Sequence, residues 1–105
     1  MQNLSDILTT LRRDFEQLLG RRLEAIYLYG SRARGDAQPD SDIDILAVVR
    51  GSFNHMDLLE MTSPVTCGLS LENDVVISSA FISHDRFDNE KSPFILNVKR
   101  EGIAI

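Results

Sequence analysis

Two short apolar segments, residues 23–29 and 43–49, most strongly constrain how this chain can fold. Both are dominated by aliphatic and aromatic side chains, and each is predicted to form a β-strand. Their nearly continuous apolar character indicates strands that are buried on both faces. A Gly-Ser pair directly follows the first segment and ends it. The sequence therefore predicts a small β-sheet that needs helices to cover it.

Helical periodicity is clearest in residues 4–19, where apolar side chains recur every three or four positions. Asn3 or Ser5 can cap the start of this helix, and Gly20 can close its end. A shorter helix is predicted over residues 56–61, stopped or bent by Pro64. Residues 75–82 are predicted to form a third strand. A last helix over 92–101 is predicted to end at Gly102 and to precede a strand or tail at 103–105. The fold class is therefore α/β, built around one sheet.

The composition excludes several classes of protein. With 105 residues, the chain is expected to form a single domain spanning 1–105. A net charge of −5 disfavours direct nucleic-acid binding through phosphate contacts. The single cysteine, Cys67, excludes an internal disulfide and a cysteine-based zinc site. No apolar run is long enough to span a membrane, and no apolar signal segment is present, so a cytoplasmic location is expected.

The chemistry is concentrated between the two predicted strands. Four carboxylates, Asp36, Asp40, Asp42 and Asp44, crowd a segment that contains no lysine or arginine. Like charges at this density repel one another and raise each other's pKa. Such a cluster is tolerated if it is solvated in a loop, or if a bound cation offsets it.

Asp42 and Asp44 begin the second apolar segment. Because side chains alternate across a strand, both carboxylates point to one face and can share divalent cations that prefer oxygen ligands. The alternative is that they are strand-entry residues facing water. The Gly30-Ser31 turn could approach a phosphate closely, with Arg32 and Arg34 beside it. Taken alone, it could equally be an ordinary turn with solvated arginines.

The two pieces become more informative together. If the two apolar strands pair in an antiparallel manner, Gly30-Ser31 lies beside Asp42 and Asp44. A phosphate-binding turn and a metal-binding carboxylate pair would then share one edge of the sheet. Phosphoryl and nucleotidyl transfer need this combination, because both depend on a positioned polyphosphate and on metal ions that absorb developing charge.

The segment YGSRARGDAQPDSDIDI carries a family resemblance. Gly30-Ser31, followed after residues 32–41 by Asp42-Ile43-Asp44, resembles the signature of the DNA polymerase β-type nucleotidyltransferase superfamily. The surrounding sequence is similar to its minimal nucleotidyltransferases, the MNT domains. The resemblance covers most of the chain and implies a small mixed β-sheet with flanking helices.

The resemblance also implies roles for individual residues. Gly30 and Ser31 would hold the triphosphate of ATP, and Arg32 would assist. Asp42 and Asp44 would bind two Mg²⁺ ions, and a third carboxylate from a later strand would complete the catalytic site. Asp74 is the expected third carboxylate, although a simple turn residue at that position is the alternative.

Minimal nucleotidyltransferases of this kind resemble MntA-type antitoxins, whose partner is an all-helical HEPN ribonuclease. The resemblance implies that AMP passes from ATP to a tyrosine of that toxin and neutralises it. Two alternatives stay open on the sequence: an antitoxin that acts by binding alone, and adenylyl transfer to a small molecule.

Overall fold

The computed structural model describes residues 2–38 and 41–105, so Asp40 lies outside the described residues. The strands are β1 (Leu23–Tyr29), β2 (Ile43–Val49), β3 (Ile77–Ser83) and β4 (Ile103–Ala104). The α-helices are α1 (Leu4–Leu19), α2 (Ser31–Arg34), α3 (His55–Asn73), α4 (His84–Asn89) and α5 (Pro93–Glu101), and a 3-10 turn, η1 (Gly20–Arg22), joins α1 to β1.

The four strands form one mixed sheet in the order β3-β2-β1-β4. β1 pairs with β2 and with β4 in an antiparallel manner, whereas β2 and β3 are parallel and are connected through α3. This arrangement confirms the predicted fold class and the antiparallel pairing of the first two strands. The small mixed sheet implied by the resemblance is also confirmed.

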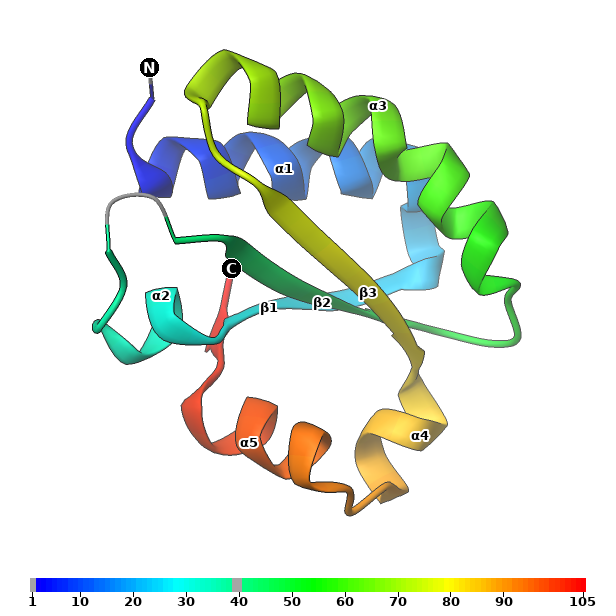
Figure 1. Ribbon diagram of the computed structural model, residues 1–105. Helices are drawn as coiled ribbons and strands as arrows, with labels where there is room; N and C mark the ends of the chain where they lie inside the picture. The colour runs from blue at the N-terminus through cyan, green and yellow to red at the C-terminus, as the bar shows by residue number, and fades with distance from the viewer. Residues whose placement is uncertain (1, 39–40) are drawn as a thin grey trace.

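Helices cover both faces of the sheet. Figure 1 shows α1 and α3 on one face, and α4 and α5 on the other. The apolar side chains divide in the same way, because alternate residues of each strand point to opposite faces. Ile43, Ile45 and Ala47 of β2 join the core with α1, while Leu46 and Val48 join the core with α5.

The first helix begins and ends where its sequence predicts. The Asn3 side chain accepts a hydrogen bond from the Asp6 amide at 2.9 Å, which caps the first turn. At the other end, Gly20 adopts φ 58° and donates its N–H to the Glu16 carbonyl. Leu11 and Phe15 on the apolar side of α1 are completely buried.

The predicted helix over 56–61 is too short. α3 runs from His55 to Asn73 and passes through Pro64 without ending. Proline at this position removes one backbone donor, but the helix is retained because it supplies the crossover between the parallel strands and packs on α1. Buried Leu58 and Leu69 fix it from either side of the proline.

The segment after β3 contains a helix that the sequence analysis did not predict. β3 spans Ile77–Ser83 rather than 75–82, and α4 follows it at once. The Ser83 hydroxyl caps α4 by accepting a hydrogen bond from the Arg86 amide at 3.2 Å. Buried Phe87 stacks on Tyr27 with a centroid distance of 5.2 Å, which anchors this short helix to β1.

Within the described residues, no helix is both long and apolar enough to cross a membrane.

Candidate functional site

The Gly-Ser turn and the carboxylate pair meet at one edge of the sheet. Tyr29, the last residue of β1, lies directly opposite Asp44 in the antiparallel register. A Cβ atom built on the next residue, Gly30, would lie 2.6 Å from Oδ2 of Asp44. Gly30 also has φ 77°, a conformation that other residues rarely adopt. Glycine is therefore needed here both for the turn and for its contact with the carboxylate.

The short helix α2 begins at Ser31, immediately after Gly30. The Gly30 carbonyl accepts hydrogen bonds from the amides of Ala33 and Arg34, both at 3.1 Å, which closes the first turn. Gly35 ends the helix in the left-handed conformation. The first amides of a helix have no acceptor within it, so those of Ser31 and Arg32 begin a turn suited to an anion.

Arg32 braces the approach to Asp42. Its Nη2 and Nε atoms donate to the Ser41 carbonyl at 2.7 and 3.2 Å. The Ser41 hydroxyl in turn accepts a hydrogen bond from the Gln38 amide at 2.8 Å. These bonds tie α2 to the residue that precedes Asp42, so Arg32 positions the carboxylate segment. Ser41 is not among the residues predicted from the sequence, where its place directly before Asp42 is the signal that points to it.

The carboxylate pair carries uncompensated negative charge. Burial raises the pKa of Asp44 above its ordinary value, and the neighbouring charge of Asp42 raises that pKa further. The pKa of the Tyr29 phenol is also raised, mainly by burial and to a smaller extent by the charge of Asp44. Among the ion pairs of residues 2–38 and 41–105, none involves Asp42 or Asp44. Two such oxygen donors suit a divalent cation, which would relieve their repulsion.

Asp74, the expected third carboxylate, does not lie on a strand. It follows the last residue of α3, adopts the left-handed conformation with φ 51°, and donates its N–H to the Ser70 carbonyl. It is exposed, and β3 begins only at Ile77. The part of the chain that the structure describes contains no cluster of three Asp, Glu, His or Cys side chains able to hold a metal. The structure thus brings Asp42 and Asp44 together with Gly30 and does not gather Asp74 with them.

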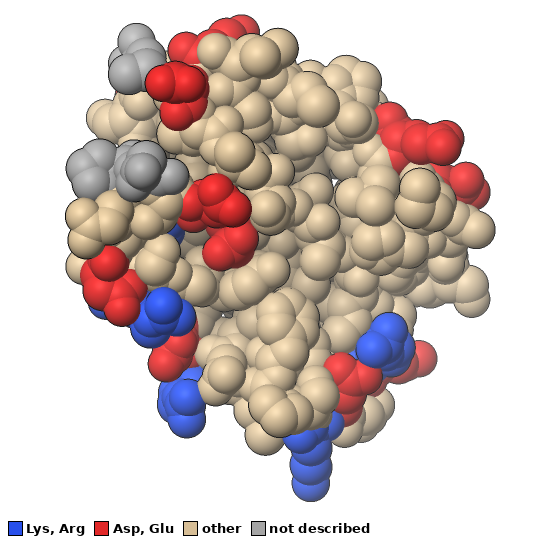
Figure 2. Space-filling model, viewed as in Figure 1, with Lys and Arg blue, Asp and Glu red and all other residues tan. Residues whose placement is uncertain are grey.

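The face of the molecule that carries β3 and α3 is largely uncharged. Figure 2 shows that charged side chains lie mainly near its margins, with one acidic group set further inward on the side where β2 begins. Exposed apolar side chains here include Leu71 near the end of α3 and Val76, which lies between α3 and β3. A cation or phosphate bound at the start of β2 would therefore lie next to an uncharged surface.

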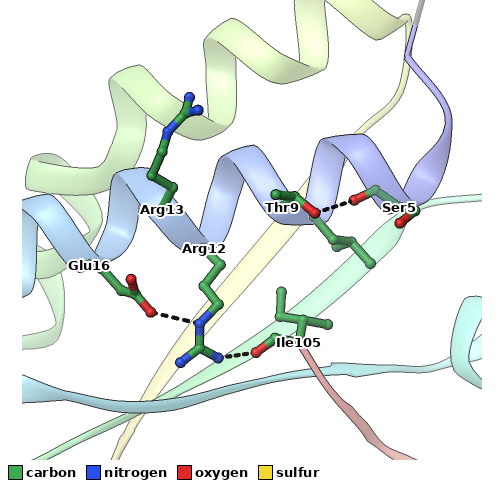
Figure 3. A pocket seen from close by; sticks show the side chains of 7 residues that line it. Ser5, Thr9, Arg12, Arg13, Glu16 and Ile105 are labelled. Carbon is green, nitrogen blue, oxygen red and sulfur yellow. Dashed lines mark hydrogen bonds and ion pairs between the residues drawn. The ribbon is translucent and has the colours of Figure 1, made fainter.

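A separate pocket of about 440 Å³ lies between α1 and the end of the chain. Figure 3 shows Arg12 between Glu16 and the Ile105 carbonyl, with hydrogen bonds to both. This pocket contains neither the Gly-Ser turn nor the aspartate pair. It therefore contributes nothing to the chemistry at the start of β2.

Comparisons with known proteins agree with this geometry. A family model described as "Nucleotidyltransferase domain" matches residues 8–100. The protein adenylyltransferase MntA of Thermococcus cleftensis is 29% identical over 83 residues, which are 79% of this chain and 82% of that protein. A protein of Methanocaldococcus jannaschii, named as a candidate protein adenylyltransferase, is 26% identical over 100 residues, covering 95% of this chain and 96% of the relative.

Solved structures give the same fold. A crystal structure of a toxin–antitoxin with AMP-PNP superposes with a TM-score of 0.60 at 20% identity, covering 97% of this chain and 72% of that one. The family model spans most of the sequence, including both the Gly-Ser turn and the aspartate pair. This chain therefore belongs to the nucleotidyltransferase domain family.

Proposed function

We propose that this chain is an antitoxin that transfers AMP from Mg-ATP to a tyrosine hydroxyl of a helical HEPN-type ribonuclease toxin and thereby neutralises it. The observation that carries this proposal is the contact between the Gly30 turn and the Asp44 carboxylate. That contact joins a polyphosphate-binding element to a cation-binding pair on one edge of the sheet. The similarity to an MntA adenylyltransferase supports the same reaction.

The aspartate pair fits the metal that this chemistry requires. Asp42 and Asp44 present carboxylate oxygens, the donors that Mg²⁺ prefers. Burial, and then the charge of Asp42, raise the pKa of Asp44, and a bound cation would offset both effects. When bound, Mg²⁺ neutralises charge that develops on the α-phosphate and on the departing pyrophosphate. Asp42 and Asp44 are the residues that would hold it, with two ions expected from the resemblance.

The other residues of the site bind and orient the nucleotide. Gly30 permits close approach of the backbone, and the amides of Ser31 and Arg32 would receive the β- and γ-phosphates. The α-phosphorus is then placed over the carboxylate pair, where the acceptor oxygen attacks it in line. The bond to pyrophosphate breaks as the new oxygen–phosphorus bond forms, and the acceptor's proton passes to a carboxylate or to solvent.

The partner supplies the acceptor. A related protein is described in its MntA-HpeT crystal structure as part of a toxin–antitoxin, and this chain aligns with 72% of that protein at a TM-score of 0.59. The surface that presents the acceptor hydroxyl is therefore assigned to another protein.

Transfer of radioactivity from ATP labelled at the α-phosphorus tests the proposal. The chain is incubated with Mg²⁺, this ATP and the product of its neighbouring gene, the candidate toxin. We expect label on the toxin with the wild-type chain and a loss on the order of 10²-fold or more in Asp42→Asn. Asp36→Asn is the matched control, because it removes an exposed carboxylate that forms a surface ion pair with Arg34 at 3.3 Å.

Equal labelling by the wild-type chain and Asp42→Asn would contradict the proposal. Toxin neutralisation without any label, retained in the double variant Asp42→Asn/Asp44→Asn, would instead support an antitoxin that acts by binding alone. Labelled nucleotide transferred to a small molecule, with the toxin unlabelled, would support the third alternative.

A further inference from the structure

Ser78 occupies the sheet position next to Asp44. β2 and β3 run parallel, and Asp44 is the direct Cα partner of Ser78. Paired residues on adjacent strands point to the same face, and neighbouring strands lie about 4.8 Å apart. The alternation of side chains along each strand supports this placement. Leu46 lies on the same face of β2 as Asp44, Ile82 lies on the same face of β3 as Ser78, and both belong to the core on the α5 side. Ser78 and Asp44 therefore stand side by side on one face.

The side chain of Ser78 is available to a ligand. Ser78 is exposed and lies close to the start of β3. Just before that strand, the Val76 carbonyl accepts a hydrogen bond from the Ile43 amide at 2.8 Å, so the pairing with β2 begins there. Val76, two positions earlier and just before β3 begins, carries no polar side-chain atom. Ser78 is thus the polar side chain that β3 contributes to this face at the level of Asp44.

Asp74 does not occupy an equivalent position. It belongs to the end of α3, where its backbone turns in the left-handed conformation and bonds to Ser70. The register that pairs Ile43 with Ile77 leaves Asp74 before the paired part of β3. The placement of a third acid at Asp74 therefore depends on the loop, whereas the placement of Ser78 is fixed by the sheet.

We propose that Ser78, rather than Asp74, supplies the third protein oxygen at the Asp42–Asp44 cation site, a deepening that rests on the function proposed above. A hydroxyl is a neutral donor that can contact Mg²⁺ directly or through a coordinated water. The protein then provides two negative charges instead of three. Tight metal binding consequently depends on the phosphate oxygens of the nucleotide, and the metal enters the site together with ATP.

Direct measurement of Mn²⁺ binding to the metal-free protein tests this assignment without reference to activity. Free Mn²⁺ is followed by electron paramagnetic resonance, with and without AMP-PNP. We expect Ser78→Asp to tighten Mn²⁺ binding by about tenfold or more in the absence of nucleotide, because it adds a charged oxygen beside Asp44. We expect Ser78→Ala to weaken binding in the presence of AMP-PNP by roughly tenfold.

Two further variants act as controls. Ser52→Asp adds the same charge at an exposed position beyond the opposite end of β2, and it should change Mn²⁺ affinity by less than about twofold. Asp74→Asn should likewise stay within about twofold, because Asp74 is placed outside the pair. Circular dichroism of each variant checks that the fold is retained.

The outcomes separate this inference from the proposed function. If Asp42→Asn weakens Mn²⁺ binding, and Asp74→Asn weakens it equally while both Ser78 variants match the wild type, the assignment of Ser78 is overturned and the function stands. If wild type and Asp42→Asn bind Mn²⁺ equally, the metal site itself is wrong and both proposals fail.

Discussion

At the scale of single residues, Gly30 joins the two halves of the site. We expect Gly30→Ala to lower adenylyl transfer on the order of 10²-fold, because a Cβ atom 2.6 Å from Oδ2 of Asp44 must displace that carboxylate. The variant should also cost about 1–2 kcal/mol of unfolding free energy through its positive φ. Labelled AMP transfer and denaturant unfolding measure the two effects.

Gly35 provides a matched control for this prediction. Gly35 has φ 83°, yet a Cβ atom there would meet nothing within 4 Å. Gly35→Ala therefore carries a similar backbone cost without the contact to Asp44. Equal losses of transfer in the two alanine variants would show that the contact is not what the chemistry needs.

Asp44 is expected to weaken the metal-free fold at neutral pH. Since folding raises the pKa of Asp44, its ionised form is less favourable in the folded state than in the unfolded state. The penalty is absent below the unfolded pKa and develops as pH rises through the folded pKa. Without metal, Asp44→Asn should therefore melt at a higher temperature than wild type at pH 7, by less than about 1 kcal/mol in stability.

This stability difference has two internal checks. It should disappear near pH 3, where Asp44 is protonated in both states, and it should shrink when Mg²⁺ and AMP-PNP are added. A metal-free Asp44→Asn protein that melts below wild type at pH 7 would contradict the account. Asp36→Asn again serves as the exposed control.

The sequence was sufficient to predict much of the site at this scale. The pairing of Gly30-Ser31 with Asp42 and Asp44 follows from two strands and the antiparallel register between them, and the structure has the predicted pairing. The position of Asp74 could not be predicted, because it depends on where α3 ends and β3 begins. Ser78 escaped notice since its importance arises only from the parallel register with β2.

At the scale of elements, α3 shows how tertiary packing overrides a local signal. Pro64 predicts a break, but α3 continues because Leu58 and Leu69 bury it against the sheet and α1. The short predicted helix was therefore wrong in length although it began within one residue of His55. α4 was missed because six residues offer too little periodicity to be recognised.

Replacement of Pro64 tests this explanation. Pro64→Ala restores a backbone donor inside α3, where proline costs up to about 3 kcal/mol relative to alanine. We expect the unfolding free energy in urea to rise by about 1 kcal/mol or more. The rise should be smaller than the full helix cost of proline, because the unfolded chain also gains conformational freedom when the proline is removed. Unchanged or lower stability would indicate that α3 is shaped around the proline.

His84 links α4 to Glu24 on β1, and the strength of this contact is expected to depend on pH. His84 Nδ1 lies 2.6 Å from Oε2 of Glu24, and Nε2 lies 3.0 Å from Oδ2 of Asp88. The hydrogen bond with Glu24 is the main cause of the raised pKa of His84, and the charges of Asp88, Glu24 and Asp85 raise that pKa further. Arg50 also approaches Glu24, at 3.7 Å, and competes for that carboxylate.

A raised histidine pKa stabilises the fold at low pH. The contribution is fully present below the unfolded pKa and is lost as pH rises through the folded pKa. We expect His84→Gln to lower the melting temperature near pH 5.5 and to match wild type near pH 9. A histidine titration followed by NMR should place His84 above the ordinary value of 6.5. A loss of stability that is the same at both pH values would contradict this role.

At the scale of the whole molecule, the site lies at one edge of a small sheet that is covered by helices on both faces. The sheet brings the end of β1 and the start of β2 together, and the two helical layers bury both faces behind them. The placement of the Gly-Ser turn beside the aspartate pair is therefore a property of the sheet as a whole.

The most direct test of this account is the intact mass of the toxin after coexpression with the chain. The account predicts that toxin purified from cells with the wild-type chain or with Asp36→Asn gains the mass of one or more AMP groups on tyrosine. Toxin from cells with Asp42→Asn/Asp44→Asn should keep its unmodified mass. An unmodified toxin that is nevertheless neutralised by the wild-type chain, or equal modification with the double variant, would contradict the central claim.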